Sequence, residues 1–211
     1  MKLDHFFILT EPGAPAADLL VDLGMVEGTP NTHPGQGTAN RRFFFEDAAL
    51  ELIFLADENE ARSGAGRGLR AFERSGTPGA SPFGIILRAT DEATADAFPG
   101  WPYQPDYFEQ GSYFVVGDNS EMLTEPSCIL MPQNLPVATG QKLSPEPFSR
   151  VSEIRIGVPD TDASAALRTT GATERVSVVH GQPHLMELIF DEARLGERCD
   201  LRPDLPLIVR W

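Results

Sequence analysis

The tetrapeptide Glu-Leu-Ile-Phe occurs twice in this chain, at residues 51–54 and 187–190, and each copy ends a similar series of predicted elements. This internal repeat constrains the fold more than any other feature of the sequence. A unit of three or four strands and one helix has an apolar sheet face that it cannot bury alone, so repeated units have to pack together. We therefore expect one globule built from related modules.

The first unit spans residues 3–57 and has the predicted order βαβββ. A β-rich opening run is followed by a helix in which four apolar residues recur at helical spacing, and Gly24 stands where such a helix commonly ends. Three candidate strands complete the unit, at 25–32, 38–46 and 48–55.

A fainter copy of the same scheme occupies residues 83–131. It has an opening strand, a short helix, and further strands near 111–118 and 127–131. A connector rich in Gly and Arg, 58–80, contains a short predicted helix and joins this copy to the first unit. Residues 1–131 are thus predicted to form a pair of modules.

A Pro-rich linker, 132–149, leads to the last part of the chain, 150–211. There VSEIRIGV, a helix with a polar cap, RVSVVH and LMELIF repeat the scheme with about one strand fewer. The sequence therefore predicts an α+β fold of repeated βαβββ modules, with a third, trimmed βαββ unit packed in the same globule.

Charge and composition exclude several classes of function. The net charge of −14 argues against binding to nucleic acid or to anionic membranes, both of which need clustered Lys and Arg. The start of the chain does not have the pattern of a signal peptide, and no apolar run approaches the length of a membrane span. Cys128 and Cys199 lie far apart in the sequence, which favours a cytoplasmic protein with two free thiols over one with a disulfide.

His5 and Glu51 are the strongest candidates for a site, because each lies in a strand that is otherwise apolar. A buried carboxylate is costly unless it is hydrogen-bonded, paired or bound to a metal. Strand alternation places Leu3 and Phe7 on the same face as His5, and it places Ile53 and Leu55 on the same face as Glu51. If the two strands are neighbours, the imidazole and the carboxylate converge. The alternatives are a buried hydrogen-bonded pair, a metal site and a substrate contact without metal.

The segment HPGQGTANR, residues 33–41, has more polar side chains than a turn requires. Proline and glycine explain the turn itself. Glycines also let a backbone approach a ligand closely, and successive N–H groups can bind an anion. Only one of Arg41 and Arg42 can point inward, because neighbours in a strand alternate. We therefore predict a substrate-binding role for four residues of this segment: His33, Gln36, Asn40 and Arg41.

Three stretches together resemble the glyoxalase-like branch of the vicinal oxygen chelate (glyoxalase/bleomycin resistance/extradiol dioxygenase) superfamily: LDHFFI, HPGQGTANR and LELIFLAD. The resemblance implies paired βαβββ modules whose sheets curl into an open barrel around a divalent metal. It implies metal ligands on the first and fourth strands of each module, which here are His5 and Glu51. The metals expected are Zn, Ni, Mn or Fe. His5 and Glu51 are also the implied catalytic residues.

The middle unit departs from the family pattern. Our alignment puts Gly84 and Leu130 at the positions that correspond to His5 and Glu51, and neither can bind a metal through its side chain. Two ligands are few for any divalent ion. His33 is the best candidate for a third ligand. Four residues of the last unit could contribute only if that unit faces the first: Glu153, His180, His184 and Glu187.

The leading hypothesis is a glyoxalase-like small-molecule enzyme that acts on a carbonyl or enediolate-type substrate in the concavity of the sheet, with or without a metal. Lyase, isomerase and dioxygenase activities stay open. The alternative is a binding protein of the same fold that sequesters a small molecule, and a third option is an adaptor for other proteins. Barrels of this family are often completed by dimerisation, so a homodimer is one expected arrangement.

Overall fold

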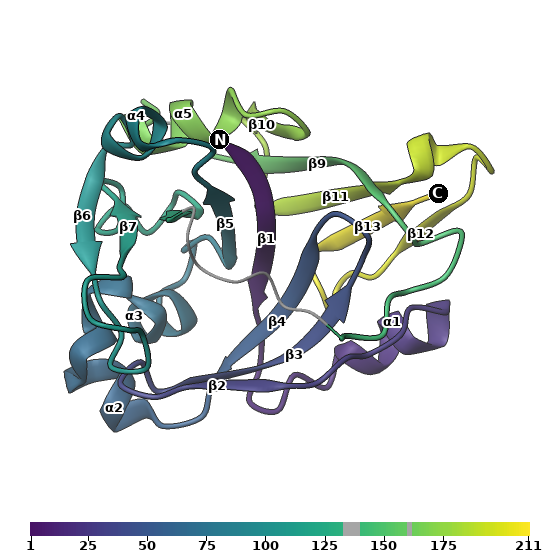
Figure 1. Cartoon of the computed structure of the whole chain (residues 1–211). Helices are drawn as coiled ribbons and strands as arrows, with labels where there is room; N and C mark the ends of the chain where they lie inside the picture. Colours follow the sequence, from purple (N-terminus) through teal and green to yellow (C-terminus); the bar gives the residue numbers. More distant parts are fainter. Residues whose placement is uncertain (133–139, 160–161) are drawn as a thin grey trace.

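A computed structural model of the chain describes residues 1–132, 140–159 and 162–211. Its strands form two sheets, one of eight strands and one of five (Figure 1). Residues 133–139 of the predicted Pro-rich linker, 132–149, lie outside the described residues. None of the helices that the described residues form is long and apolar enough to cross a membrane.

The eight-stranded sheet contains both of the predicted N-terminal modules and curls into a half-barrel (Figure 1). Its strand order is β2-β3-β4-β1-β5-β8-β7-β6. The helices α1 (Ala17–Leu23) and α4 (Glu92–Asp96) each follow the first strand of a module. The strands are β1 (Lys2–Leu9), β2 (Asn31–His33), β3 (Thr38–Phe44), β4 (Ala49–Leu55), β5 (Phe83–Arg88), β6 (Gly100–Tyr103), β7 (Phe114–Gly117) and β8 (Ser127–Met131).

Both modules are built on the same pairing. The first strand of each lies parallel to its last strand, β1 beside β4 and β5 beside β8. The modules then meet edge to edge, because β1 pairs antiparallel with β5. The expected neighbourhood of the opening strand and the Glu51 strand is therefore confirmed, together with the α+β fold of repeated modules.

Some strands differ from their predicted bounds. The predicted strand 25–32 forms only as β2 at its end, preceded by an isolated bridge between Glu27 and Phe43. β6 was not predicted, because Pro102 in a four-residue run is an unfavourable signal for a strand. It forms at the edge of the sheet, where a missing N–H donor does not interrupt a ladder.

The two faces of the eight-stranded sheet have different roles. One face carries Phe6, Leu50 and Ile85, which are fully buried against the five-stranded sheet in one continuous core. The opposite face carries a small separate cluster of Phe7, Ile53 and Ile86. Apolar residues on both faces explain why these strands read as continuous hydrophobic runs.

A bulge near the start of β1 determines toward which face of the sheet each residue of this strand points. Leu3 pairs with Leu87 and His5 with Ile86, so Asp4 is an extra residue in the strand. Leu3 consequently belongs to the core, whereas His5 lies on the opposite face beside the hollow. The predicted common face of Leu3 and His5 is therefore wrong, because simple alternation takes no account of a bulge.

The five-stranded sheet is formed by residues 151–210, in the order β10-β9-β11-β13-β12. The predicted order βαββ forms over 151–190, and two short strands follow it. The elements are β9 (Val151–Val158), α5 (Ala165–Gly171), β10 (Val176–His180), β11 (Leu185–Phe190), the 3-10 turn η2 (Asp191–Ala193), β12 (Arg198–Asp200) and β13 (Leu207–Arg210).

Strand directions show that the second sheet repeats the plan of the first with fewer strands. β9 is parallel to β10, β11 is parallel to β13, and the two halves meet where β9 pairs antiparallel with β11. β11 thus corresponds to an opening strand. The alignment of Glu187 with Glu51 is wrong in this respect, because β4 runs parallel to its module's first strand and β11 runs antiparallel to β9.

The connector between the modules carries three short helical segments, α2 (Glu58–Ser63), η1 (Ala65–Leu69) and α3 (Ala71–Gly76). The Asp57 side chain caps α2 by accepting a hydrogen bond from the Glu60 backbone N–H. α3 lies close to β1 and β4. The connector therefore reaches the hollow face of the eight-stranded sheet.

Candidate functional site

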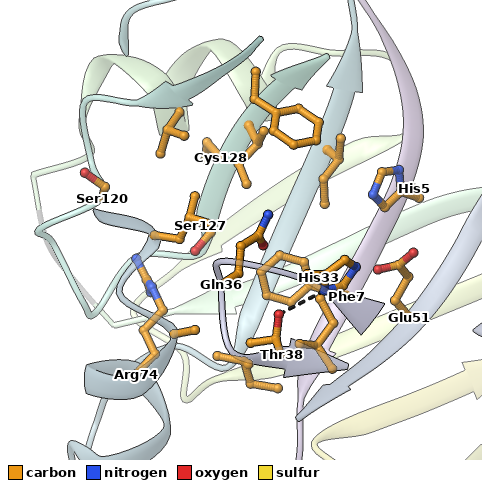
Figure 2. Close-up of a pocket in the computed structure, with 18 of the residues that line it drawn as sticks. His5, Phe7, His33, Gln36, Thr38, Glu51, Arg74, Ser120, Ser127 and Cys128 are labelled. Atoms are coloured by element: carbon orange, nitrogen blue, oxygen red, sulfur yellow. Dashed lines mark hydrogen bonds between the residues drawn. The ribbon is translucent and has the colours of Figure 1, made fainter. Parts of the chain in front are cut away.

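A cavity of about 110 Å³ lies on the hollow face of the eight-stranded sheet. Side chains of β1, β4, β5, β7 and β8 form its wall together with the first hairpin, the connector and the loops before and after β7. Figure 2 shows His5, Glu51 and His33 at one side of this cavity and Arg74 at the other. Its polar lining residues are His5, His33, Gln36, Thr38, Glu51, Arg74, Tyr107, Asn119, Ser120 and Ser127.

His5 is held by the bulge residue that precedes it. The Asp4 carboxylate lies 2.7 Å from His5 Nδ1, and its other oxygen accepts a hydrogen bond from Arg88 Nε at 2.5 Å. Burial lowers the pKa of His5, but the hydrogen bond to Asp4 and the charge of Glu51 outweigh this effect and raise the pKa above its usual 6.5. Because Nδ1 is occupied by Asp4, Nε2 is the nitrogen left for a ligand.

Glu51 lies in the central part of β4, directly across from Phe7 of β1, and its side chain is only 9 % exposed. Among the residues that the structure describes, none forms a hydrogen bond or an ion pair with its carboxylate. An unpaired carboxylate in an apolar wall destabilises the fold unless it is solvated or bound, so Glu51 is a candidate for binding or chemistry.

His33 lies at the mouth of the cavity, where its Nδ1 is 2.9 Å from Thr38 Oγ1. Burial lowers its pKa, although the charge of Glu51 opposes part of this effect. His33 is thus neutral near neutral pH, whereas His5 retains its proton to a higher pH than a free imidazole does. The two imidazoles differ because only His5 has a carboxylate partner.

The other residues of the first hairpin divide between the cavity and the internal contacts of the hairpin. Gln36 lines the cavity and donates a hydrogen bond to the Tyr107 hydroxyl at 2.9 Å. The N–H groups of Gly35 and Gly37 bind a carboxylate, but it is the protein's own Glu60, at 2.9 Å to each oxygen. These backbone donors are therefore occupied, and the expected binding of a ligand anion by them is not supported.

Asn40 and Arg41 do not line the cavity. The Asn40 side chain is buried and accepts a hydrogen bond from the Asn31 backbone N–H at 2.8 Å. Arg41 donates through Nε and Nη2 to both oxygens of Glu27, at 2.8 and 2.6 Å, and this pairing raises the pKa of Arg41. Both side chains secure the hairpin to its surroundings.

Comparison with known proteins gives similarity of fold only. No protein-family model and no curated protein matches the chain. A solved structure of a hypothetical protein from Staphylococcus aureus superposes over 99% of this chain and 98% of its own, with a TM-score of 0.58 at 10% identity. Methylmalonyl-CoA epimerase from Mycobacterium tuberculosis covers 64% of this chain and 89% of its own, with a TM-score of 0.44 at 14% identity. A mutant of 4-hydroxymandelate synthase from Streptomyces coelicolor covers 81% of this chain and 50% of its own, with a TM-score of 0.44 at 15% identity.

The order and direction of the strands decide the fold family. Two βαβββ modules, each with its first strand parallel to its last, join edge to edge in one curled sheet around a hollow. The chain has the vicinal oxygen chelate fold. His5 and Glu51 occupy the first and fourth strands of the first module in that fold.

The metal ligands that the vicinal oxygen chelate fold implies are incomplete in this chain. In the described parts of the chain, no group of three or more His, Cys, Asp and Glu side chains is arranged to hold an ion. In the second module, Leu130 points into the core and Ile129 lines the cavity in its place. A Cβ added at Gly84 would lie 2.0 Å from the Phe7 ring, so this glycine makes room for Phe7. The residues present do not fit a metal site.

Residues of the last unit stay away from the cavity. Glu187 pairs with Arg210 and Glu153 with Arg155 on the five-stranded sheet. His184 contacts the carbonyl of Gly79, and neither it nor His180 is among the cavity residues. The described residues of the third module, 150–159 and 162–211, therefore supply no side chain to the cavity.

Sequence reasoning missed five polar residues of the cavity: Thr38, Arg74, Asn119, Ser120 and Ser127. Arg74 is only 5 % exposed, although an arginine in a short connector helix is usually at the surface. No local pattern marks these residues, which come from the first hairpin, the connector, the loop after β7 and the start of β8. Tyr107, from the loop before β7, also lines the cavity.

Proposed function

We propose that the protein is a small-molecule enzyme that moves a proton at a carbon next to a carbonyl group. The observation that carries this proposal is the Glu51 carboxylate, which lies unpaired in the wall of a mostly apolar cavity beside a histidine whose pKa is raised by Asp4 and Glu51. A base and an acid of this kind, on one face of adjacent strands, suit general acid–base catalysis.

The proposed step uses only groups of this chain. Glu51 takes the proton from the carbon, and the electron pair moves onto the carbonyl oxygen. His5 donates a hydrogen bond or its Nε2 proton to that oxygen, and Asp4 stabilises the imidazolium while it holds the ring in place. Return of a proton to the carbon regenerates the carbonyl, which gives isomerisation or epimerisation. Neutral His33 at the mouth orients the substrate.

Isomerase activity is one of the three activities that the resemblance leaves open, and the proposed step is of this kind. Proton transfer needs a base and an acid at the reacting carbon, and the lining supplies a candidate for each in Glu51 and His5. The ligand set for a divalent ion is missing from the described residues, so no step of the proposed reaction passes through a metal. Titration of the purified chain with Zn, Ni, Mn and Fe(II) should then give no tight binding that His5→Ala removes. Tight, His5-dependent binding would restore the metal-assisted version.

A second candidate is a protein that binds a small molecule without turnover. The mostly apolar cavity wall favours it, since such a wall holds a ligand regardless of chemistry. An adaptor for other proteins is less well supported, because an adaptor has no need of an unpaired carboxylate inside a cavity.

Proton exchange tests the proposal without knowledge of the product. We would incubate the protein in D₂O with a panel of 2-oxo acids, 3-oxo acids, their amides and hydroxyketones, and follow loss of the carbon-bound proton by NMR. We expect at least one compound to exchange faster than in buffer, and Glu51→Gln to slow this exchange by about 100-fold or more. Glu174→Gln, at an exposed carboxylate, is the matched control and should exchange at the wild-type rate.

The panel also separates the two candidates. Saturation-transfer NMR on the same samples shows which compounds bind. Binding without exchange would support the non-catalytic candidate, and absence of exchange across the whole panel would reject the proposed reaction. The homodimer remains a prediction, which light scattering of the purified chain checks.

A further inference from the structure

Arg74 lies on the side of the cavity away from His5 and Glu51, and its guanidinium is directed toward Ser127 (Figure 2). It comes from α3 and is only 5 % exposed. One nitrogen, Nη1, donates to three backbone carbonyls, those of Ser81, Leu123 and Glu125, at 3.4, 3.1 and 2.6 Å. These contacts fix the plane of the guanidinium.

The other two nitrogens of Arg74, Nε and Nη2, are buried and have no hydrogen-bond partner in the described structure. Buried donors on a charged group are rarely left unpaired, because each loses its water without replacement. Nε and Nη2 form one edge of the guanidinium, and their N–H bonds point the same way. This edge is the one that binds a carboxylate with two parallel hydrogen bonds.

Arg41 shows the same edge in use in this protein, since its Nε and Nη2 bind both oxygens of Glu27. Arg74 has no such partner. Glu125, a buried acid whose charge acts on Arg74, has its oxygens occupied by the backbone N–H and hydroxyl of Ser164 and by Asn119 Nδ2. Glu125 is not among the cavity residues, so it does not fill the open edge of Arg74.

Burial lowers the pKa of Arg74 to about 10, against the opposing influence of Cys128 and Glu125. The Arg74 side chain is still charged at neutral pH, so one side of the cavity contains a buried cation. The hydroxyl groups of Ser120 and Ser127 lie in the same lining and can donate to an anion.

We propose that Arg74 binds the carboxylate of the substrate, side-on through Nε and Nη2. The substrate is then a small carbonyl-bearing carboxylate, with its acid group at Arg74 and its reacting carbonyl at His5 and Glu51. The placement of the reacting end rests on the proposed function, whereas binding of the carboxylate does not. The volume of about 110 Å³ restricts this ligand to a short chain.

The test compares each short oxo acid of the panel with its primary amide, which has the same shape without the charge, and with inorganic phosphate. Binding is measured by titration calorimetry, and the Arg Nε–H signals are followed by ¹⁵N NMR in the wild-type protein. We expect the carboxylate to bind at least about tenfold more tightly than its amide. We also expect it to shift one Arg Nε–H signal that the amide leaves in place, and phosphate to bind more weakly than the carboxylate.

Arg74→Lys keeps the charge and removes the paired donors, so it should weaken carboxylate binding by about tenfold and leave amide binding unchanged. Arg67→Lys, at an exposed position of η1, is the matched control. Equal affinity of the wild-type protein for acid and amide would overturn the proposal, as would failure of every carboxylate to bind or wild-type affinity in Arg74→Lys. If Arg74→Lys does not fold, the wild-type comparison of acid with amide decides alone.

The outcomes for the two proposals are distinct. Glu51→Gln should lose proton exchange and still bind the carboxylate. Carboxylate binding through Arg74 without any exchange would reject the reaction and keep the anion site. Exchange that is equal for acids and amides would keep the reaction and reject the anion site.

Discussion

Asp4 and His5 are neighbours in the sequence that meet through their side chains, because the bulge in β1 turns both toward the same side. An unbulged strand would point them to opposite faces. The Asp4 carboxylate thereby fixes the imidazole and raises its pKa, while it also binds Arg88.

This pairing makes stability depend on pH. Below pH 6.5 the His5 imidazole is protonated in both the folded and the unfolded chain, so the Asp4–His5 pair contributes fully to the free energy of unfolding. This contribution is lost as the pH rises from 6.5 through the raised pKa of His5. Asp4→Asn should therefore cost about 2 kcal/mol at pH 6 and less at pH 9, where the contact with Arg88 alone is lost. Urea unfolding at both pH values measures this, and an equal loss at both would contradict it. An NMR titration should show a lower His5 pKa in the variant.

Replacement of Glu51 by leucine should stabilise the protein while it removes the proposed reaction. The variant exchanges an unpaired buried carboxylate for an apolar group, so we expect the free energy of unfolding to increase by about 1–2 kcal/mol. Glu187→Leu is the matched control from the second Glu-Leu-Ile-Phe copy, and it should not stabilise because Glu187 is paired with Arg210. Denaturant unfolding of both variants checks the difference. A destabilised Glu51→Leu would show that the carboxylate supports the fold.

Gly84→Ala should disrupt the floor of the cavity. The added Cβ would lie 2.0 Å from the Phe7 ring, so the ring has to move, at a cost of about 2–3 kcal/mol. Gly76→Ala, where a Cβ meets nothing within 4 Å, is the control and should change stability by less than about 0.5 kcal/mol. If overpacking is the cause, Phe7→Leu in the Gly84→Ala background should recover part of the loss.

Glu60→Ala should loosen the first hairpin. Its carboxylate binds the N–H groups of Gly35 and Gly37, and loss of these two charge-assisted bonds should cost about 2–3 kcal/mol. Hydrogen exchange of these two amides should accelerate, while Glu58→Ala at the exposed start of α2 should leave them unchanged. Unaltered exchange in Glu60→Ala would mean that the hairpin is held by its other contacts.

The sequence predicts much of this architecture because its strongest signals are local. Alternation, a helix end at Gly24 and the repeated module give the eight-stranded sheet, and polar residues inside apolar strands lead to His5 and Glu51. The bulge at Asp4 has no such signal, since an extra residue in a strand looks like any other. Strand direction is equally hidden, so the second Glu-Leu-Ile-Phe was aligned with the wrong strand of its unit.

The rest of the site depends on contacts between distant segments. Arg74 is buried because carbonyls about 50 residues later in the chain receive its Nη1. Asn40 and Arg41 have side chains that can bind a ligand, which is why the sequence predicts them in the site. In the structure the Asn40 side chain accepts a hydrogen bond from the Asn31 backbone N–H, and the Arg41 guanidinium donates to the Glu27 carboxylate. A polar residue in a hairpin is thus as often a structural partner as a ligand contact.

The connector between the two modules touches the cavity at several places. It supplies Leu69, Ala71 and Arg74 to the lining, and its Glu60 anchors the hairpin that carries His33. Strands β1 and β4 provide His5 and Glu51, whereas this short stretch shapes the opposite wall. Exchange of the connector alone would accordingly redesign that wall while every strand, and with them His5 and Glu51, is kept.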